Sequence, residues 1–211
     1  MGGIAIIGWG SLIWDLDDLA PRVAGDWAMG AGPALPLEFS RISAKRRMGL
    51  AVCIDAEAGV PCATHWIRST RATVLRAAVD LALRERTVPG RIGYVALPGS
   101  AAAAGLAEAE HLRQARADAV AATIDVWCRS AGVEAAVWTD LASNFRALRG
   151  GPFSAEAGRA YLADLTGGSR AEAVRYIQAA PASTDTPLRR LLAETDWWRD
   201  AAAALGGPAG R

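Results

Sequence analysis

The chain has 211 residues, of which 52% are hydrophobic, and its 23 Lys and Arg residues nearly balance 22 Asp and Glu residues, for a formal charge of +1. This length allows one well-buried core, and no Ser/Gly-rich linker or block of charge divides it, which predicts a single domain over residues 1–211. The balanced charge argues against nucleic acid as a partner. The apolar N-terminal segment lacks a positive n-region and a cleavage site, and no apolar run approaches the roughly 18 residues of a membrane span, so we expect a cytoplasmic protein without a membrane partner.

The three cysteines argue against both a disulfide framework and a metal site. Cys53, Cys62 and Cys128 are odd in number and show no paired spacing, which favours a reducing compartment. Cys62 and His65 resemble half of a zinc site, but the only other histidine, His111, has no second Cys/His pair beside it. We therefore expect no metal site.

The hydrophobic pattern, taken in chain order, predicts an α+β fold. Strands are expected at 4–9, 35–43, 48–55 and 60–67, with the last three forming an antiparallel meander. A helix over 70–86, capped by Ser69 or Thr70, precedes a strand at 91–97, a long helix from about 112 to 132 and a short strand at 135–138. The last quarter, about 154–205, is expected to be a helical extension, with helices over 154–165, 169–179 and 187–204.

A glycine-rich loop follows the first strand directly and reads Gly8-Trp9-Gly10-Ser11-Leu12. Because Gly8 and Gly10 lack a Cβ, the backbone there can take positive φ and let a small anionic ligand approach its N–H groups. A tight strand exit without a ligand is the alternative. A dinucleotide-binding fingerprint is disfavoured, since Ile13 stands where its third glycine should be.

The helix over 70–86 carries a candidate acid in its last turn. Val74, Ala78, Leu81 and Glu85 advance by four, three and four residues, which places Glu85 on the apolar face. The same spacing places Arg76, Asp80 and Arg84 on another face. An acid that faces the core is a candidate for proton transfer. In the alternative interpretation, Glu85 pairs with Arg84 or Arg86 in solvent.

Polar residues gather after the strand at 135–138, where Thr139, Asp140, Ser143 and Asn144 either contact a substrate or cap a turn with their own side chains. The sequence shows no Ser-His-Asp or Cys-His arrangement, which disfavours hydrolysis by a nucleophilic residue. The aromatic residues of the last quarter have helical spacing and are expected to pack between helices.

Two separated motifs resemble the gamma-glutamyl cyclotransferase-like family, most closely its ChaC-type, glutathione-degrading branch. The loop from Gly8 to Trp14 is similar to the Gly-Tyr-Gly-Ser-Leu-Ile-Trp loop of that family, with Trp9 in place of the tyrosine. Leu83-Arg84-Glu85, followed by Gly93-Tyr94, resembles the family's Arg-Glu and Gly-Tyr elements, with a longer connection between them. Together the motifs cover roughly residues 4–97.

The resemblance implies a small mixed β-barrel and a transferase or lyase that needs no cofactor. Glu85 would be the catalytic acid/base, and the substrate would contact Gly8, Trp9, Gly10, Ser11, Leu12 and Tyr94. The implied reaction is an intramolecular aminolysis, in which the α-amine of a small γ-glutamyl substrate attacks its own γ-carbonyl and expels an amine, leaving 5-oxoproline. The alternative is a non-catalytic member of the same fold that binds a small acidic metabolite or a protein partner.

Overall fold

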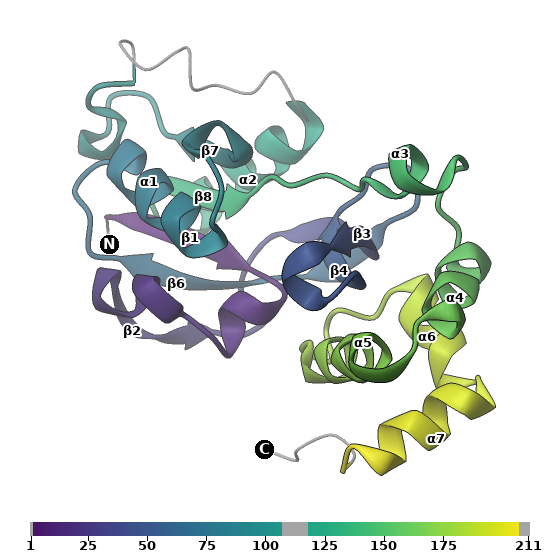
Figure 1. Ribbon diagram of the computed structural model, residues 1–211. Coiled ribbons are helices and arrows are strands. Elements are labelled where there is room, and N and C mark those ends of the chain that lie inside the picture. The colour runs from purple at the N-terminus through teal and green to yellow at the C-terminus, as the bar shows by residue number, and fades with distance from the viewer. Residues whose placement is uncertain (1, 107–117, 207–211) are drawn as a thin grey trace. The chain divides into compact units, whose positions relative to one another are not determined.

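The computed structural model describes residues 2–106 and 118–206 and contains helices and two β-sheets, which confirms the α+β class (Figure 1). Within those residues no closed barrel is found, so the barrel prediction is not confirmed. The chain divides into two compact units, one of Met1–Leu35 and Ala63–Leu141, the other of Pro36–Cys62 and Ala142–Arg211. That both belong to a single domain stays a prediction. No helix in the described parts is long and apolar enough to cross a membrane.

The first unit is built on a five-stranded sheet of order β2-β6-β1-β8-β7. Its central strand β1 (Ile4–Gly8) is buried at all five residues, which explains its continuous apolar sequence. It runs antiparallel to β6 (His65–Ser69) and parallel to β8 (Ala135–Thr139). One edge is β7 (Ile92–Ala96), which is antiparallel to β8. The other edge is β2 (Val23–Ala28), which is antiparallel to β6 and is not among the predicted strands.

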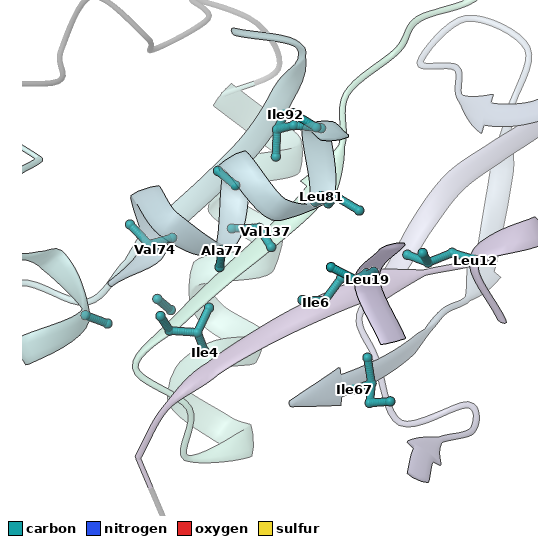
Figure 2. Close-up of a cluster of buried hydrophobic side chains, with 14 residues drawn as sticks. Ile4, Ile6, Leu12, Leu19, Ile67, Val74, Ala77, Leu81, Ile92 and Val137 are labelled. Atoms are coloured by element: carbon teal, nitrogen blue, oxygen red, sulfur yellow. The ribbon is translucent and has the colours of Figure 1, made fainter. Parts of the chain in front are cut away.

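The apolar face of helix α1 (Val74–Glu85) closes the core of the first unit against this sheet. Figure 2 shows Val74, Ala77 and Leu81 of the helix directed at the side chains of the strands. Leu12 and Leu19, from the two 3-10 turns after β1 (Ser11–Ile13 and Asp17–Arg22), complete this cluster. The core therefore lies directly beneath the loop that follows β1.

The remaining helix of the first unit, α2, spans Asp118–Ala131 and lies against β7 and β8. It ends where Gly132 takes a φ of +68°, as predicted from the glycine. The predicted start of this helix, near residue 112, lies outside the described residues. Two short 3-10 turns, Pro89–Arg91 and Ala101–Ala103, flank β7.

The second unit contains most of a three-stranded sheet of order β4-β3-β5. Strands β3 (Ala34–Ser43) and β4 (Gly49–Ile54) are antiparallel, with the 3-10 turn Ala44–Arg46 between them. The predicted meander is wrong, because β5 (Val60–Ala63) pairs with β3 instead of β4. The turn after β4 returns the chain to β3: the Asp55 carboxylate accepts the N–H groups of Glu57 and Ala58, and the N–H of Gly59 reaches the carbonyl of Asp55.

The predicted strand at 60–67 is two strands, since β5 ends at Ala63 and β6 begins at His65 in the other sheet. Between them lies Thr64, which is fully buried. Its hydroxyl donates to the carbonyl of Pro33 and its own carbonyl accepts the N–H of Gly32. These bonds separate Thr64 from the strand pairing on either side. The sequence predicted a continuous strand here, because Thr64 is a β-branched residue within an apolar run.

The helical extension is confirmed as a series of helices: α4 (Ala155–Asp164), α5 (Gly167–Ala179), α6 (Pro187–Ala193) and α7 (Asp196–Ala204). A short helix that was not predicted, α3 (Phe145–Arg149), precedes them. The predicted cap of α4 is confirmed, because the Ser154 side chain accepts the N–H of Ala157. Helix α5 begins two residues before the predicted Ser169. The predicted helix over 187–204 is broken at Thr195, whose hydroxyl bonds back to the carbonyl of Leu191 while the residue becomes the N-cap of α7.

Helix α1 begins and ends through backbone geometry instead of side-chain caps. Its N-cap is Thr73, not the predicted Ser69 or Thr70, and the Ser69 hydroxyl accepts the N–H of Arg71 instead. At the other end, Arg86 is left-handed with a φ of +54°. The N–H groups of Arg86 and Thr87 bond to the carbonyls of Leu83 and Ala82, which closes the last turn.

Arg86→Gly is therefore expected to raise the free energy of unfolding by about 1 kcal/mol, because glycine adopts the left-handed conformation without the penalty of a Cβ. The exposed ion pair of Arg86 with Asp17, 3.9 Å apart, contributes little to be lost. Arg76→Gly, in the interior of the same helix, is the matched control and should lose about 1 kcal/mol. Urea unfolding of wild type and the two variants measures whether the free energy of unfolding rises in Arg86→Gly and falls in Arg76→Gly. Equal losses in both variants would contradict the expectation.

Candidate functional site

The loop after β1 is a short 3-10 turn held by its own backbone. The N–H of Ile13 donates to the carbonyl of Gly10, and the N–H groups of Trp14 and Asp15 donate to the carbonyl of Ser11. The turn's first internal bond is thus donated by Ile13, so the N–H groups of Ser11 and Leu12 are not used by the turn itself. That these groups bind a substrate stays a prediction.

The predicted positive φ at the loop glycines is wrong. Gly10 has a φ of −135°, and Gly8 is not among the residues with positive φ. Gly8 is required for another reason: a Cβ at this position would lie 2.9 Å from the ring of Trp27 and 3.1 Å from the side chain of Ile13. The absence of a side chain at Gly8 therefore serves packing within the first unit.

The other predicted loop residues differ in their exposure. Trp9 and Leu12 are buried, and Leu12 belongs to the hydrophobic core, so a ligand would meet the backbone of Leu12 instead of its side chain. Ser11 is partly buried and directs its hydroxyl toward the end of α1. Of the loop side chains, that of Ser11 is the one placed to act in a polar site.

The end of α1 differs from the predicted arrangement of faces. Arg84, expected on a different face from the apolar one, is only 2% exposed, whereas the Glu85 side chain is 17% exposed. The spacing Ala77, Leu81, Arg84 advances by four and three residues, which is the signal that places Arg84 on the buried face. The prediction missed the burial of Arg84 because it drew the apolar face through Glu85 and placed Arg84 on the face of Arg76.

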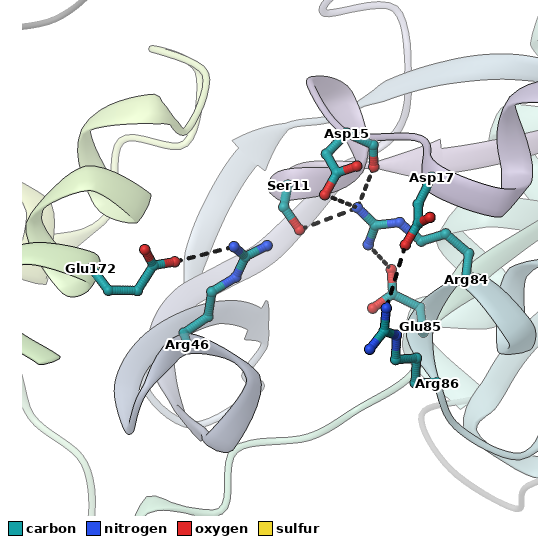
Figure 3. Close-up of polar contacts among 8 residues, drawn as sticks. All are labelled: Ser11, Asp15, Asp17, Arg46, Arg84, Glu85, Arg86 and Glu172. Carbon is teal, nitrogen blue, oxygen red and sulfur yellow. Dashed lines mark hydrogen bonds and ion pairs between the residues drawn. The ribbon is translucent and has the colours of Figure 1, made fainter. Parts of the chain in front are cut away.

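The guanidinium of Arg84 lies between the loop and Glu85 (Figure 3). Its Nη1 donates to Oε1 of Glu85 at 2.5 Å. Its Nη2 donates to the Ser11 hydroxyl at 3.4 Å and to the carbonyl of Asp15, whose carboxylate is 4.0 Å away. The structure thus brings Glu85 and the Gly8–Leu12 loop onto one side chain, although the two motifs are 73 residues apart in the sequence.

The Glu85 carboxylate uses one of its two oxygens to bind Arg84. Oε1 accepts the bond from Nη1 of Arg84, and Oε2 is the other acceptor of the carboxylate. The side chain is neither fully buried nor free in solvent, which fits a group that must reach a small ligand. The pairing with Arg84 was the alternative interpretation, but it occurs on a buried guanidinium instead of in solvent.

Tyr94 lies on the strand where the resemblance expects it and packs against the hydrophobic cluster that also contains Leu12 and Leu81. It is partly buried. Its predicted contact with substrate stays a prediction. The neighbouring Gly93 lies opposite Trp138, and a Cβ there would lie 2.1 Å from the indole ring. Gly93 is therefore required by packing.

The polar segment after β8 includes two side chains that serve the second unit. Asn144 accepts the N–H of Ile42 and donates to its carbonyl, and the Ser143 hydroxyl donates to the carbonyl of Ser40. The capping interpretation of the sequence is close to this, although the backbone that is bonded belongs mainly to β3. Arg41, on the same strand, donates to the carbonyl of Ala142 at 2.5 Å.

The second unit contains a fully buried acid, Glu38. Burial raises the pKa of the Glu38 carboxyl, against the hydrogen bonds from Thr186 and from the N–H groups of Phe39 and Leu188, which lower it. Its bonds to Leu188 N–H and Thr186 lie at the start of α6, so the carboxylate has a structural role there. Cys53 and Cys128 are buried free thiols, and burial raises the pKa of each to about 12.

Stability should therefore depend on pH through Glu38. A folded-state pKa above the unfolded value of about 4.5 means that the folded protein binds the proton more tightly, so the stabilisation is complete below that value and is lost as the pH rises through the folded-state pKa. The free energy of unfolding of wild type minus that of Glu38→Gln should fall as the pH is raised from about 4 to about 7. Urea unfolding across this range measures the difference, and a flat difference would contradict the assignment.

Comparisons with protein-family models, with curated proteins and with solved structures found no match to this chain. Across the described parts of the chain, no group of three or more His, Cys, Asp and Glu side chains is arranged to hold a metal ion.

Proposed function

We propose that the first unit carries a gamma-glutamyl cyclotransferase-like activity that converts a small γ-glutamyl amine or peptide, such as glutathione, into 5-oxoproline and a free amine or amino acid. The observation that carries the proposal is the meeting of both motifs at Arg84, whose guanidinium bonds to Glu85 and to Ser11. A catalytic acid/base and a loop that binds the same small substrate must lie this close. The barrel-type fold of the family is part of the proposal.

The chemistry follows from the groups at this site. Oε2 of Glu85 takes a proton from the α-ammonium of the substrate, which frees the nitrogen lone pair to attack the γ-carbonyl carbon. A C–N bond closes the five-membered ring, and the negative charge that develops on the carbonyl oxygen would be met by the backbone N–H groups of Ser11 and Leu12. The bond to the leaving nitrogen then breaks as Glu85 returns the proton to it. Glu85 takes the second proton from the ring nitrogen, which becomes the neutral N–H of 5-oxoproline, and passes it to the departing amine, which leaves as an ammonium. The carbonyl is re-formed, and no external water or cofactor is consumed.

In this proposal the loop and Glu85 have separate roles, substrate binding and proton transfer. The loop binds the substrate through its backbone and so holds the chain folded with its amine near its γ-carbonyl, which supplies the proximity that an intramolecular reaction needs. Glu85 moves the proton. Trp9, which replaces the tyrosine of the resembling loop, is buried and contributes no phenolic oxygen.

The test is incubation of the purified protein with glutathione, γ-glutamyl amino acids and γ-glutamyl amines, followed by mass-spectrometric detection of 5-oxoproline. Release that depends on the protein and on Glu85 supports the proposal and identifies the leaving amine. The alternative, a non-catalytic binder of small acidic metabolites, is favoured by the occupation of Glu85 Oε1 by Arg84. It predicts no 5-oxoproline but measurable binding of the same compounds by calorimetry.

A further inference from the structure

We propose that Arg84 is a positioning residue that holds the loop after β1 and the Glu85 carboxylate in one fixed geometry. Its importance for turnover rests on the function proposed above. The link between the loop and the helix end is a property of the fold and can be measured without turnover. The resemblance of the two motifs assigns a role to Glu85 and none to this arginine.

The burial of Arg84 is poorly explained by stability alone. Its side chain is 2% exposed and lies on the same face of α1 as Ala77 and Leu81, where an apolar residue would pack without desolvating a charge. Its Nε is buried without a hydrogen-bond partner, which costs free energy. A buried guanidinium with an unpaired Nε is costly on an apolar face. We infer that Arg84 occupies this position because of the bonds that its other two nitrogens make to the loop and to Glu85.

Those bonds point in two directions. Nη1 donates to Glu85 at 2.5 Å, while Nη2 donates to the Ser11 hydroxyl at 3.4 Å and to the carbonyl of Asp15. The guanidinium is planar, so the two nitrogens fix both the distance and the direction between the loop and the carboxylate. A lysine ammonium is a single compact charge and could not hold both partners in the same geometry.

The surrounding charges favour positioning over direct binding of a substrate carboxylate. The charge of Arg84 is already met by Glu85 and by Asp15, whose carboxylate lies 4.0 Å away. Asp17 and Arg86, 3.9 Å apart, form a second pair beside them (Figure 3). A further anion would compete with two carboxylates for one buried cation.

The test compares Arg84→Lys and the apolar Arg84→Met with wild type, and uses Arg76→Lys, an exposed position of the same helix, as the matched control. Hydrogen exchange followed by mass spectrometry reports on the loop amides of Ile13, Trp14 and Asp15, and steady-state assays give kcat and KM for 5-oxoproline release. In both Arg84 variants we expect loop exchange to rise on the order of tenfold and kcat to fall about 10²-fold, while the control changes neither.

Two results would overturn the proposal: loop exchange unchanged in a folded Arg84 variant, or faster loop exchange with kcat at the wild-type level. Use of both lysine and methionine keeps the test valid if one variant does not fold, and circular dichroism identifies that case. If wild type itself releases no 5-oxoproline, the proposed function fails. The hydrogen-exchange rate of the loop amides then still decides whether Arg84 joins the loop to Glu85. Faster exchange in the Arg84 variants supports the link, and unchanged exchange refutes it.

Discussion

Glu85→Gln is expected to fold like wild type and to lose 5-oxoproline release by about 10²-fold or more. Glutamine has the shape of glutamate, and its Oε1 can still accept the bond from Nη1 of Arg84. The amide cannot take a proton from the α-ammonium of the substrate or return one to the leaving nitrogen. The loss should therefore appear in kcat, with KM changed much less.

The measurement is 5-oxoproline release at saturating and at low substrate, with circular dichroism and a thermal melt to confirm folding. Glu57→Gln is the matched control, because its side chain is 81% exposed and pairs only with the exposed Arg146 in the second unit. Wild-type turnover in Glu85→Gln would remove Glu85 from the chemistry. A loss of equal size in Glu57→Gln would show that the assay reports stability instead of catalysis.

Gly93→Ala is expected to destabilise the first unit by about 1–3 kcal/mol, because the new methyl group overpacks a closed interior. A Cβ on Gly93 would lie 2.1 to 2.4 Å from three atoms of the Trp138 indole, which is itself 3% exposed and has little room to move. Strands β7 and β8 pair with these two residues opposite each other, so the backbone cannot separate them without loss of the ladder.

Urea unfolding measures this effect, with Gly90→Ala as the control. A Cβ on Gly90 meets no atom within 4 Å and its φ is not positive, so that variant should stay within about 0.5 kcal/mol of wild type. Gly93→Ala should cost less in a Trp138→Leu background than in wild type, because the smaller side chain makes room for the methyl group, although Trp138→Leu is itself destabilising. Additive losses in the double variant would contradict the packing argument.

Local sequence signals determined most of the elements. The apolar run at 4–9, the helical spacing of apolar residues over 70–86 and the glycine at 132 correctly predicted β1, α1 and the end of α2, because hydrophobic period and chain-breaking residues act within one element. Local signals also made Glu85 and the loop after β1 candidate site residues. The boundaries that failed, at Thr64 and Thr195, are positions where a side chain bonds to the backbone.

The tertiary structure alone decided which strands are neighbours and why particular residues are needed. The pairing of β5 with β3 instead of β4, and the edge strand β2, depend on contacts between distant segments that no local period encodes. Gly8 and Gly93 were assigned to a substrate loop and a motif, yet each leaves space for an indole, of Trp27 and Trp138 respectively.

Arg84 shows most clearly what the sequence by itself determined and what it did not. The spacing of the helix fixed the direction of its side chain relative to Ala77 and Leu81, so its burial was implicit in the sequence. Its partners were not, because Ser11 and Asp15 come from a loop 69 to 73 residues away. A buried charge is stable only where such distant groups converge on it, and that convergence is fixed by the packing of α1 on the sheet.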